Sequence, residues 1–199
     1  MSDILFDSAL NFKKLLDTRY LLTFGRKNVI TNLTLDFNEN NFCHLAGLHK
    51  LKDMHHLRKD ASFNFNQILN RNLTYAEISR SSHAYEIQDR LRILSKLEII
   101  LDQENTNWKY CQDRSPFFSK VRTDFLIEHK DGLVISYIFI TKNSVDDFHS
   151  CNSCFEFKHR DYTRNQTQIT LLEKKKFNKL TSSSEILYRR ASYTPFAQN

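Results

Sequence analysis

Two histidines and a lysine lie within seven residues of one another in a segment predicted to be helical. They are His44, His49 and Lys50. Imidazole exchanges protons near neutral pH, and an ammonium group stabilises a developing anion. Phosphodiester transfer needs both, so this segment is the first candidate for catalysis. Gly47 lies in the same segment and costs a helix about 1 kcal/mol relative to Ala, which indicates close approach of another backbone or a ligand.

A structural interpretation of the same residues stays open. On a helix, Leu48 shares a face with His44, while His49 and Lys50 lie toward its sides. His44 would then be a hydrogen-bonded core histidine, and the other two would decorate the surface. Because this position indicates partial burial of His44, His49 is predicted to be the more accessible base.

Two further polar segments could assist phosphate chemistry. Lys120 could meet a phosphate, and Asp124 could orient a base or pair with Arg122. The alternative is a charged loop that leads into a strand. The segment 80–83 contains two serines between Arg and His, and it could equally end one helix and cap the next.

Cys151 and Cys154 have the spacing of half a tetrahedral zinc site, with His149 and His159 nearby. A convincing zinc site needs a second close pair, and the other two cysteines are isolated in the sequence. Two cysteines near the start of a buried strand are the simpler interpretation. No metal and no cofactor are predicted.

The net charge of +6 is confined to the last fifth of the chain. Residues 158–190 carry nine Lys or Arg and three acids, a net of +6, so the remaining residues sum to zero. The basic side chains there are interleaved with aromatic ones such as Tyr162. Cations contact phosphates and aromatic rings stack on unpaired bases, which indicates a nucleic-acid surface. A solvated strand edge, where lysines oppose aggregation, is the alternative.

Composition bounds the class of protein. With 199 residues, 40% of them hydrophobic, the chain is long enough for one domain with a real core. Only 3 Gly and 2 Pro argue against a Gly-loop nucleotide fold, a turn-rich sandwich and a solenoid. Acidic residues interrupt the N-terminal apolar stretch, no apolar run is long enough to span a membrane, and the cysteines are few. A cytoplasmic protein that does not contact membranes is expected.

Hydrophobic periodicity predicts which elements must position these residues. The expected helices span 4–16, 40–55, 63–69 and 83–101, and a capping box joins Thr74 and Glu77. Strands are expected over 20–24, 32–37, 124–130, 133–141, 153–158, 167–174 and 185–189, with a tight turn at residues 131–132. This order predicts an α+β fold in which a helical N-terminal half packs on one face of a C-terminal antiparallel sheet. One domain is expected over 1–199, with a helical extension at 1–18, a core at 19–190 and a tail at 191–199.

These segments together resemble a known family. Residues 41–51, Asn-Phe-Cys-His-Leu-Ala-Gly-Leu-His-Lys-Leu, are similar to the N-F-x-H-L-x-G-L-H-K-L block of the phage-encoded barnase–EndoU–colicin–RelE-like nucleases, fourth subgroup. The resemblance continues in order through residues 78–82, 89–91, 97–102, 116–126, 161–163 and 166–174, and it covers about 20–188. The 41–51 block is its most specific part.

The resemblance implies a barnase- or RelE-like α+β fold and a metal-independent endoribonuclease of a phage or mobile element, such as a toxin. In that chemistry the ribose 2′-hydroxyl attacks the adjacent phosphate, assisted by a base, an acid and cations. The implied partner is RNA, including single-stranded RNA, with an antitoxin or host protein as a further candidate. The candidate catalytic residues are His44, His49, Lys50, Ser81, Lys120 and Asp124. The candidate nucleic-acid-binding residues are Lys158, Arg160, Tyr162, Arg164, Gln168, Lys174 and Lys176.

The chain departs from the family pattern at Phe125, where relatives tend to have Tyr. If that hydroxyl takes part in the chemistry, this chain lacks it. The alternative function is therefore a non-catalytic inhibitor on the same scaffold, which binds nucleic acid or a host protein.

Overall fold

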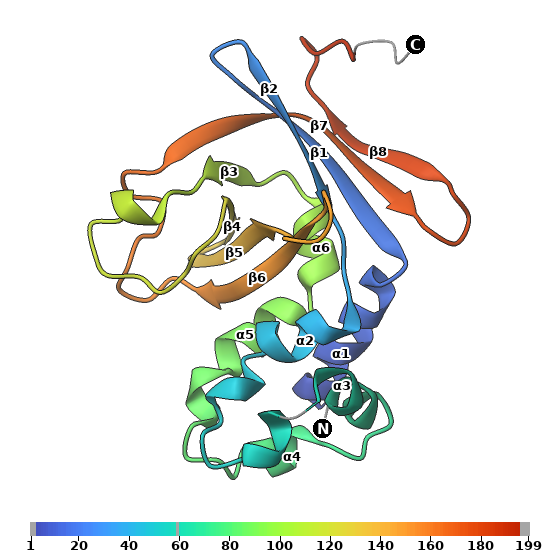
Figure 1. Cartoon of the computed structure of the whole chain (residues 1–199), viewed down its shortest axis with the longest axis vertical. Helices are drawn as coiled ribbons and strands as arrows, with labels where there is room; N and C mark the ends of the chain where they lie inside the picture. The colour runs from blue at the N-terminus through green and yellow to red at the C-terminus, as the bar shows by residue number, and fades with distance from the viewer. Residues whose placement is uncertain (1–2, 59, 196–199) are drawn as a thin grey trace.

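The computed structural model describes residues 3–58 and 60–195 (Figure 1). Several of its helices begin at residues whose side chains cap the first turn. The Asp3 carboxylate accepts hydrogen bonds from two backbone N–H groups in the first turn of its helix. Asn38 and Thr74 each begin a capping box. The Thr74 box was predicted and is confirmed, whereas the helix after Asn38 begins at Glu39, one residue before the expected start at residue 40.

Helices dominate the first half of the chain and strands the second. The α-helices are α1 (Ile4–Leu15), α2 (Glu39–Leu45), α3 (Ala61–Leu69), α4 (Tyr75–Ile78), α5 (Gln88–Leu94) and α6 (Leu97–Asp102). The 3₁₀ helices are η1 (Leu48–Lys50), η2 (His55–Arg58), η3 (Ala84–Glu86) and η4 (Gln112–Arg114). The strands are β1 (Thr18–Arg26), β2 (Val29–Leu35), β3 (Thr106–Lys109), β4 (Phe125–Asp131), β5 (Val134–Lys142), β6 (His149–Glu156), β7 (Thr167–Asn178) and β8 (Ser184–Arg189).

The prediction of single helices over 40–55 and 83–101 was wrong. Gly47 has a positive φ of 78°, which ends the first helix after α2 and leaves η1 and η2 as separate short turns. The second stretch is divided into η3, α5 and α6. Lys96 lies between α5 and α6 with a φ of −131°, which is not helical.

The strands form one sheet that closes on itself. Hydrogen-bonded neighbours run β1-β2-β6-β5-β4-β3-β7, and residues 170–178 of β7 pair back with residues 18–25 of β1. Seven of the eight strands therefore make a closed β-barrel, and β8 pairs with β7 outside the ring. In the described part of the chain every pairing is antiparallel except β2 with β6, which meet at Leu35 and His149.

The predicted helical half on one face of an open antiparallel sheet was therefore wrong. Two features close the sheet. One is β3, a four-residue strand that was not predicted and that links β4 to β7. The other is β7, which is 12 residues long and pairs with β3 and β8 along one edge and with β1 along the other. Pairing between strands so far apart in the sequence leaves no trace in local periodicity.

The larger hydrophobic core fills the barrel and continues into the helices. Helices α1–α5 gather at one end of the barrel, and α6 lies between them and the strands (Figure 1). Phe12 of α1 is fully buried, with its ring centroid 5.5–6.1 Å from those of Phe37, Phe42 and Phe65. The predicted extension 1–18 thus contributes to the core, although residues 1–2 lie outside the described residues.

A smaller core covers the outer face of β4 and β5. Tyr110, Leu126, Tyr137 and Phe139 are buried there, and side chains from the segments before β4 and after β6 pack over them. Burial along β4 and β5 is consequently almost continuous instead of alternating. These covering segments also form one wall of the cleft described below.

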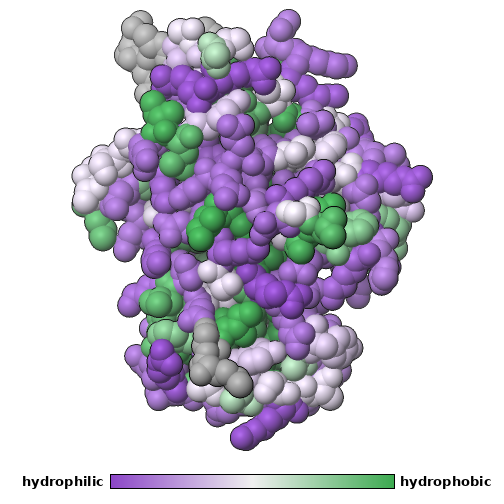
Figure 2. Space-filling model, turned by 180° about the vertical axis from the view of Figure 1, so that it is seen from behind, coloured by the Kyte–Doolittle hydropathy of each residue, from purple (hydrophilic) through white to green (hydrophobic). Residues whose placement is uncertain are grey.

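The surface opposite to the view of Figure 1 is mostly hydrophilic, with hydrophobic residues in separate patches (Figure 2). Within residues 3–58 and 60–195, no helix combines the length and the apolar character needed to cross a bilayer. Residues 196–199 of the predicted tail lie outside the described residues.

Candidate active site

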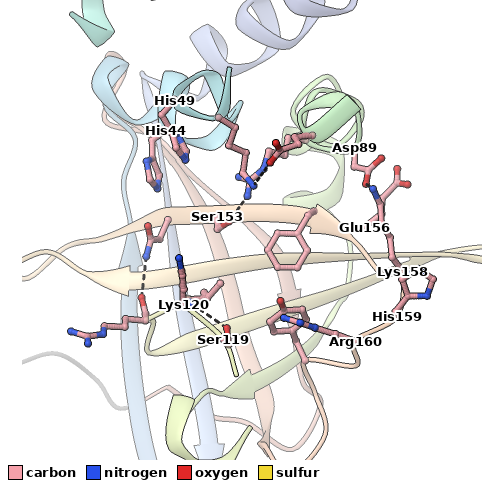
Figure 3. A pocket seen from close by; sticks show the side chains of 18 of the residues that line it. His44, His49, Asp89, Ser119, Lys120, Ser153, Glu156, Lys158, His159 and Arg160 are labelled. Carbon is pink, nitrogen blue, oxygen red and sulfur yellow. Dashed lines mark hydrogen bonds and ion pairs between the residues drawn. The ribbon is translucent and has the colours of Figure 1, made fainter. Parts of the chain in front are cut away.

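A cleft of about 870 Å³ separates the helices from the outer face of β6 (Figure 3). The helical wall consists of His44, His49, Lys50, Tyr85, Glu86, Asp89 and Arg90. The opposite wall consists of Asn152, Ser153, Phe155 and Glu156 from β6 together with loop residues Phe118, Ser119, Lys120, Val121, Arg122, Lys158, His159, Arg160 and Tyr162. The cleft therefore joins segments that are distant in the sequence.

The structure brings seven of the predicted site residues into this cleft. They are His44, His49, Lys50, Lys120, Lys158, Arg160 and Tyr162. His44 and His49 lie side by side at its helical wall, and Lys120 lies across from them (Figure 3). Candidate catalytic and candidate binding residues thus share one space.

Ser81 and Asp124 do not line the cleft. The Ser81 hydroxyl donates a 2.5 Å hydrogen bond to the Asp53 carboxylate, and the Asp124 carboxylate accepts a 2.8 Å bond from the backbone N–H of Lys142. The geometry gives both residues a role in holding loops. Neither lies where it could orient a histidine of the cleft.

The other predicted binding residues also lie outside the cleft. Arg164 and Gln168 are exposed elsewhere on the surface. Lys174 is 4% exposed, and its ammonium group donates to the carbonyl oxygens of Leu101 and Gln103 at the end of α6. Burial lowers the pKa of Lys174 to about 8.

Lys176 is engaged inside the fold as well. Its ammonium group forms ion pairs of 2.8 Å with both Glu98 and Asp102. Through Lys174 and Lys176, the basic run in β7 ties the barrel to α6, while Lys175 pairs with Glu173 of the same strand. It does not form a free cationic surface at the cleft.

The break at Gly47 places the two imidazoles together. In a continuous helix, residues five apart point about 140° away from each other. Here the rings of His44 and His49 stack with centroids 4.7 Å apart and an interplanar angle of 11°. Both side chains reach solvent, so His44 is not the core histidine of the structural interpretation, although its ring is still partly buried by its neighbours.

Arg90 is a residue of the cleft that sequence reasoning did not select. It is 7% exposed and donates hydrogen bonds of 3.2 Å to the Leu45 carbonyl oxygen and to the Ser153 hydroxyl. A Cβ at Gly47 would lie 2.8 Å from Arg90 Cδ, so the glycine makes room for this side chain. A signal was present, because Arg90 falls on the apolar stripe of its helix, three residues after Ile87.

The cleft carries an excess of cations. Among the residues that the structure describes, six Lys or Arg and three acids line it, a net of +3 with neutral histidines. Each acid is already paired: Glu86 with Lys50 at 3.6 Å, Asp89 with Lys158 at 2.5 Å, and Glu156 with Arg92 at 2.9 Å. A polyanion that entered the cleft would thus meet cations without an opposing free carboxylate.

The surroundings shift the protonation of the catalytic candidates. Partial burial lowers the pKa of His44, and the positive charge of Arg90 lowers it further, while a contact with Asn152 opposes both effects. His44 is therefore neutral near pH 7 and able to accept a proton. Burial and Arg90 also lower the pKa of Lys50, against the pull of Glu86.

The cysteines considered for zinc lie inside the fold. Cys151 and Cys154 are buried in β6, and burial raises the pKa of Cys154 to about 12 and that of Cys151 as well. Such thiols are poor metal ligands because they resist deprotonation. In the described part of the chain, no group of three or more His, Cys, Asp or Glu is arranged to hold a metal ion.

Ser81 offers a test of its bracing role. Its hydrogen bond, with that of the Ser82 N–H, lowers the pKa of Asp53 to about 2. Ser81→Ala should lower the melting temperature by a few degrees at pH 7. Ser82→Ala should lower it less, because the Ser82 hydroxyl makes a longer hydrogen bond, 3.3 Å, to the Asp53 carboxylate. Because the folded pKa of Asp53 is depressed, this stabilisation exists above its unfolded pKa near 3.8 and is lost as pH falls toward about 2. Equal melting temperatures of wild type and Ser81→Ala at pH 7 would contradict this role.

A cleft that combines paired imidazoles with an excess of cations is typical of proteins that act on phosphodiesters. Residues 4–191 match the family described as phage-Barnase-EndoU-ColicinE5/D-RelE like nuclease4, and the chain belongs to this nuclease family. The match confirms the family indicated by residues 41–51. Comparison with curated proteins and with solved structures gave no match.

Proposed function

We propose that the chain is an endoribonuclease that cleaves RNA by attack of the 2′-hydroxyl on the adjacent phosphate, with no requirement for a metal ion. The observation that supports this best is the convergence of His44, His49, Lys50 and Lys120 on one positively charged cleft. These side chains are of the three kinds that the reaction needs: a base, an acid and cations. Membership of a phage nuclease family adds support, and action in the cytoplasm is part of the same proposal.

The two imidazoles divide the proton transfers. Two imidazolium cations 4.7 Å apart repel each other, which disfavours the state in which both rings are protonated. Neutral His44 takes the proton of the 2′-hydroxyl as the 2′-oxygen bonds to phosphorus. The bond from phosphorus to the 5′-oxygen then breaks, and protonated His49 gives its proton to that oxygen. Lys50 and Lys120 stabilise the charge on the phosphorane.

Unpaired RNA is the substrate that the walls of the cleft suit best. Tyr85 and Phe118 line the cleft from the helical side and the loop side, and they are 65% and 77% exposed. Large aromatic rings left in solvent beside cations are a stacking surface for unpaired bases. A duplex keeps its bases stacked on one another and cannot use these rings.

The test is incubation of the full chain with an unstructured RNA in EDTA. We expect cleavage, and we expect a duplex of the same sequence to be cut more slowly. If neither RNA is cleaved, the proposal is wrong. Binding that weakens steeply with salt but gives no products would instead support the alternative, a non-catalytic nucleic-acid-binding inhibitor.

That alternative was based on Phe125. The Phe125 ring stacks on Phe24 at 6.0 Å and contacts the His149 ring at 5.8 Å, and it does not line the cleft. The hydroxyl that relatives carry at this position would thus lie away from the histidine pair. This geometry favours the enzyme over the inhibitor.

The pH dependence of cleavage should reflect the surroundings of His44. Because its pKa lies below the ordinary 6.5, the midpoint of the rise of kcat/KM with pH should lie below that value. Arg90→Met removes a positive neighbour, so the pKa of His44 should increase and the rising limb should move to higher pH. Rate profiles of wild type and variant at constant ionic strength measure this. A limb that moves to lower pH, or not at all, would contradict the assignment of His44 as the base.

A further inference from the structure

Arg90 is a buried cation without a carboxylate partner. Only 7% of it is exposed, and no Asp or Glu of residues 3–58 and 60–195 lies within ion-pair distance of its guanidinium. Its neighbour Asp89 pairs instead with Lys158 and Arg92, each at 2.5 Å. An unpaired buried charge is costly, so its presence on the wall of a cleft calls for an explanation.

The Arg90 guanidinium has more N–H donors than hydrogen bonds to the described residues. It carries five N–H groups, and its two hydrogen bonds go to neutral acceptors, the Leu45 carbonyl oxygen and the Ser153 hydroxyl. Among residues 3–58 and 60–195, the other three N–H groups have no acceptor. The two acceptors belong to α2 and β6, so both walls of the cleft fix the orientation of the planar group.

The fold is shaped around this side chain. Gly47 leaves the space through which Arg90 passes, since any Cβ there would come within 2.8 Å of Arg90 Cδ. The Phe155 ring lies 5.7 Å from the guanidinium carbon. Arg90 also lowers the pKa values of both His44 and Lys50, which shows that its charge acts directly on the catalytic candidates.

We propose that Arg90 is a built-in phosphate-binding residue, whose free N–H groups take two oxygens of a phosphate and hold it next to His44 and His49. The planar fork of Arg matches a phosphate in a bidentate manner, and the bound anion supplies the missing countercharge. That this phosphate is the one cleaved in RNA rests on the proposed function. The anion site itself does not.

The test is thermal unfolding of the full chain titrated with inorganic phosphate at constant ionic strength, with acetate in a parallel series. Ligand that binds only the folded state raises the melting temperature. We expect phosphate to stabilise the wild type more than acetate does. In Arg90→Met the apparent affinity for phosphate should fall at least about tenfold. Arg26→Met, which removes an exposed arginine outside the cleft, should leave it unchanged.

Ser153→Ala keeps the charge of Arg90 and removes one of its two anchors, so it serves if Arg90→Met does not fold. It should weaken phosphate binding several-fold. Phosphate stabilisation that is absent in the wild type, equal for acetate, or unchanged in the Arg90→Met and Ser153→Ala variants would overturn the proposal. Phosphate binding at Arg90 without RNA cleavage would leave this site standing and overturn only the endoribonuclease function. RNA cleavage without phosphate binding at Arg90 would leave the endoribonuclease function standing and overturn only this site.

Discussion

Replacing His44 by alanine is expected to slow RNA cleavage by about 10²- to 10⁴-fold, the usual contribution of a general base. His49→Ala should have an effect of the same order, because each imidazole serves one of the two proton transfers. Both side chains are exposed, so stability should change little. Single-turnover cleavage rates and melting temperatures of the variants measure the two effects separately.

His56→Ala is the matched control, since His56 is exposed and does not line the cleft. It should cleave at the wild-type rate. If His44→Ala and His49→Ala also cleave at that rate, the histidine pair is not the acid–base machinery. An equal loss of cleavage rate in all three variants would lead to the same conclusion, because the loss would then not depend on the position of the histidine in the cleft.

Gly47→Ala is expected to affect folding and cleavage together. Gly47 has a φ of 78°, and its missing Cβ would lie 2.8 Å from Arg90 Cδ. Left-handed backbone and overpacking together should lower the free energy of unfolding by about 2 to 4 kcal/mol. Because the same turn stacks His49 on His44, cleavage per folded molecule should fall as well. Denaturant unfolding and cleavage at saturating RNA test both expectations.

Gly132→Ala separates the two causes. Gly132 also has a positive φ, of 57°, but an added Cβ there meets no atom within 4 Å. This variant should show only backbone strain, about 1 kcal/mol, and normal cleavage. Equal losses in the two variants would mean that the contact of Gly47 with Arg90 has no part in stability or activity.

Much of the local structure could be predicted from the sequence. The capping box at Thr74 and the hairpin turn at Gly132 depend on residues that lie next to one another, and both were found where expected. The closure of the barrel depends on β7 returning to β1, with Tyr20 opposite Lys176. Nothing in either segment specifies that partner, so the open sheet was a reasonable but wrong prediction.

The lysines of β7 show why the basic segment was misleading. A run of three lysines, residues 174–176, is typical of a solvated edge. In the barrel, β7 has partners along both edges, and Lys174 points inward to the end of α6. Only two of the six Lys or Arg of the cleft, Lys158 and Arg160, come from the basic segment.

The candidate site was predictable where a short motif carried it. His44, His49 and Lys50 belong to one block, and the structure places all three in the cleft. Arg90 was not selected from the sequence because it is positioned by contacts with Gly47 and Ser153, which are 43 and 63 residues away along the chain. Its hints in the sequence were a charged residue on an apolar stripe and its place in the 89–91 segment of the family resemblance.

Product analysis with a chimeric oligonucleotide tests whether this cleft cleaves RNA through the 2′-hydroxyl. The substrate is a DNA strand with a single ribonucleotide, incubated with the full chain in EDTA, and the products are identified by mass. We expect one cut, on the 3′ side of the ribonucleotide, with a 2′,3′-cyclic phosphate and a 5′-hydroxyl as the new ends. Cleavage at deoxynucleotides, 3′-hydroxyl ends, or the same products at the same rate from His44→Ala would contradict this mechanism.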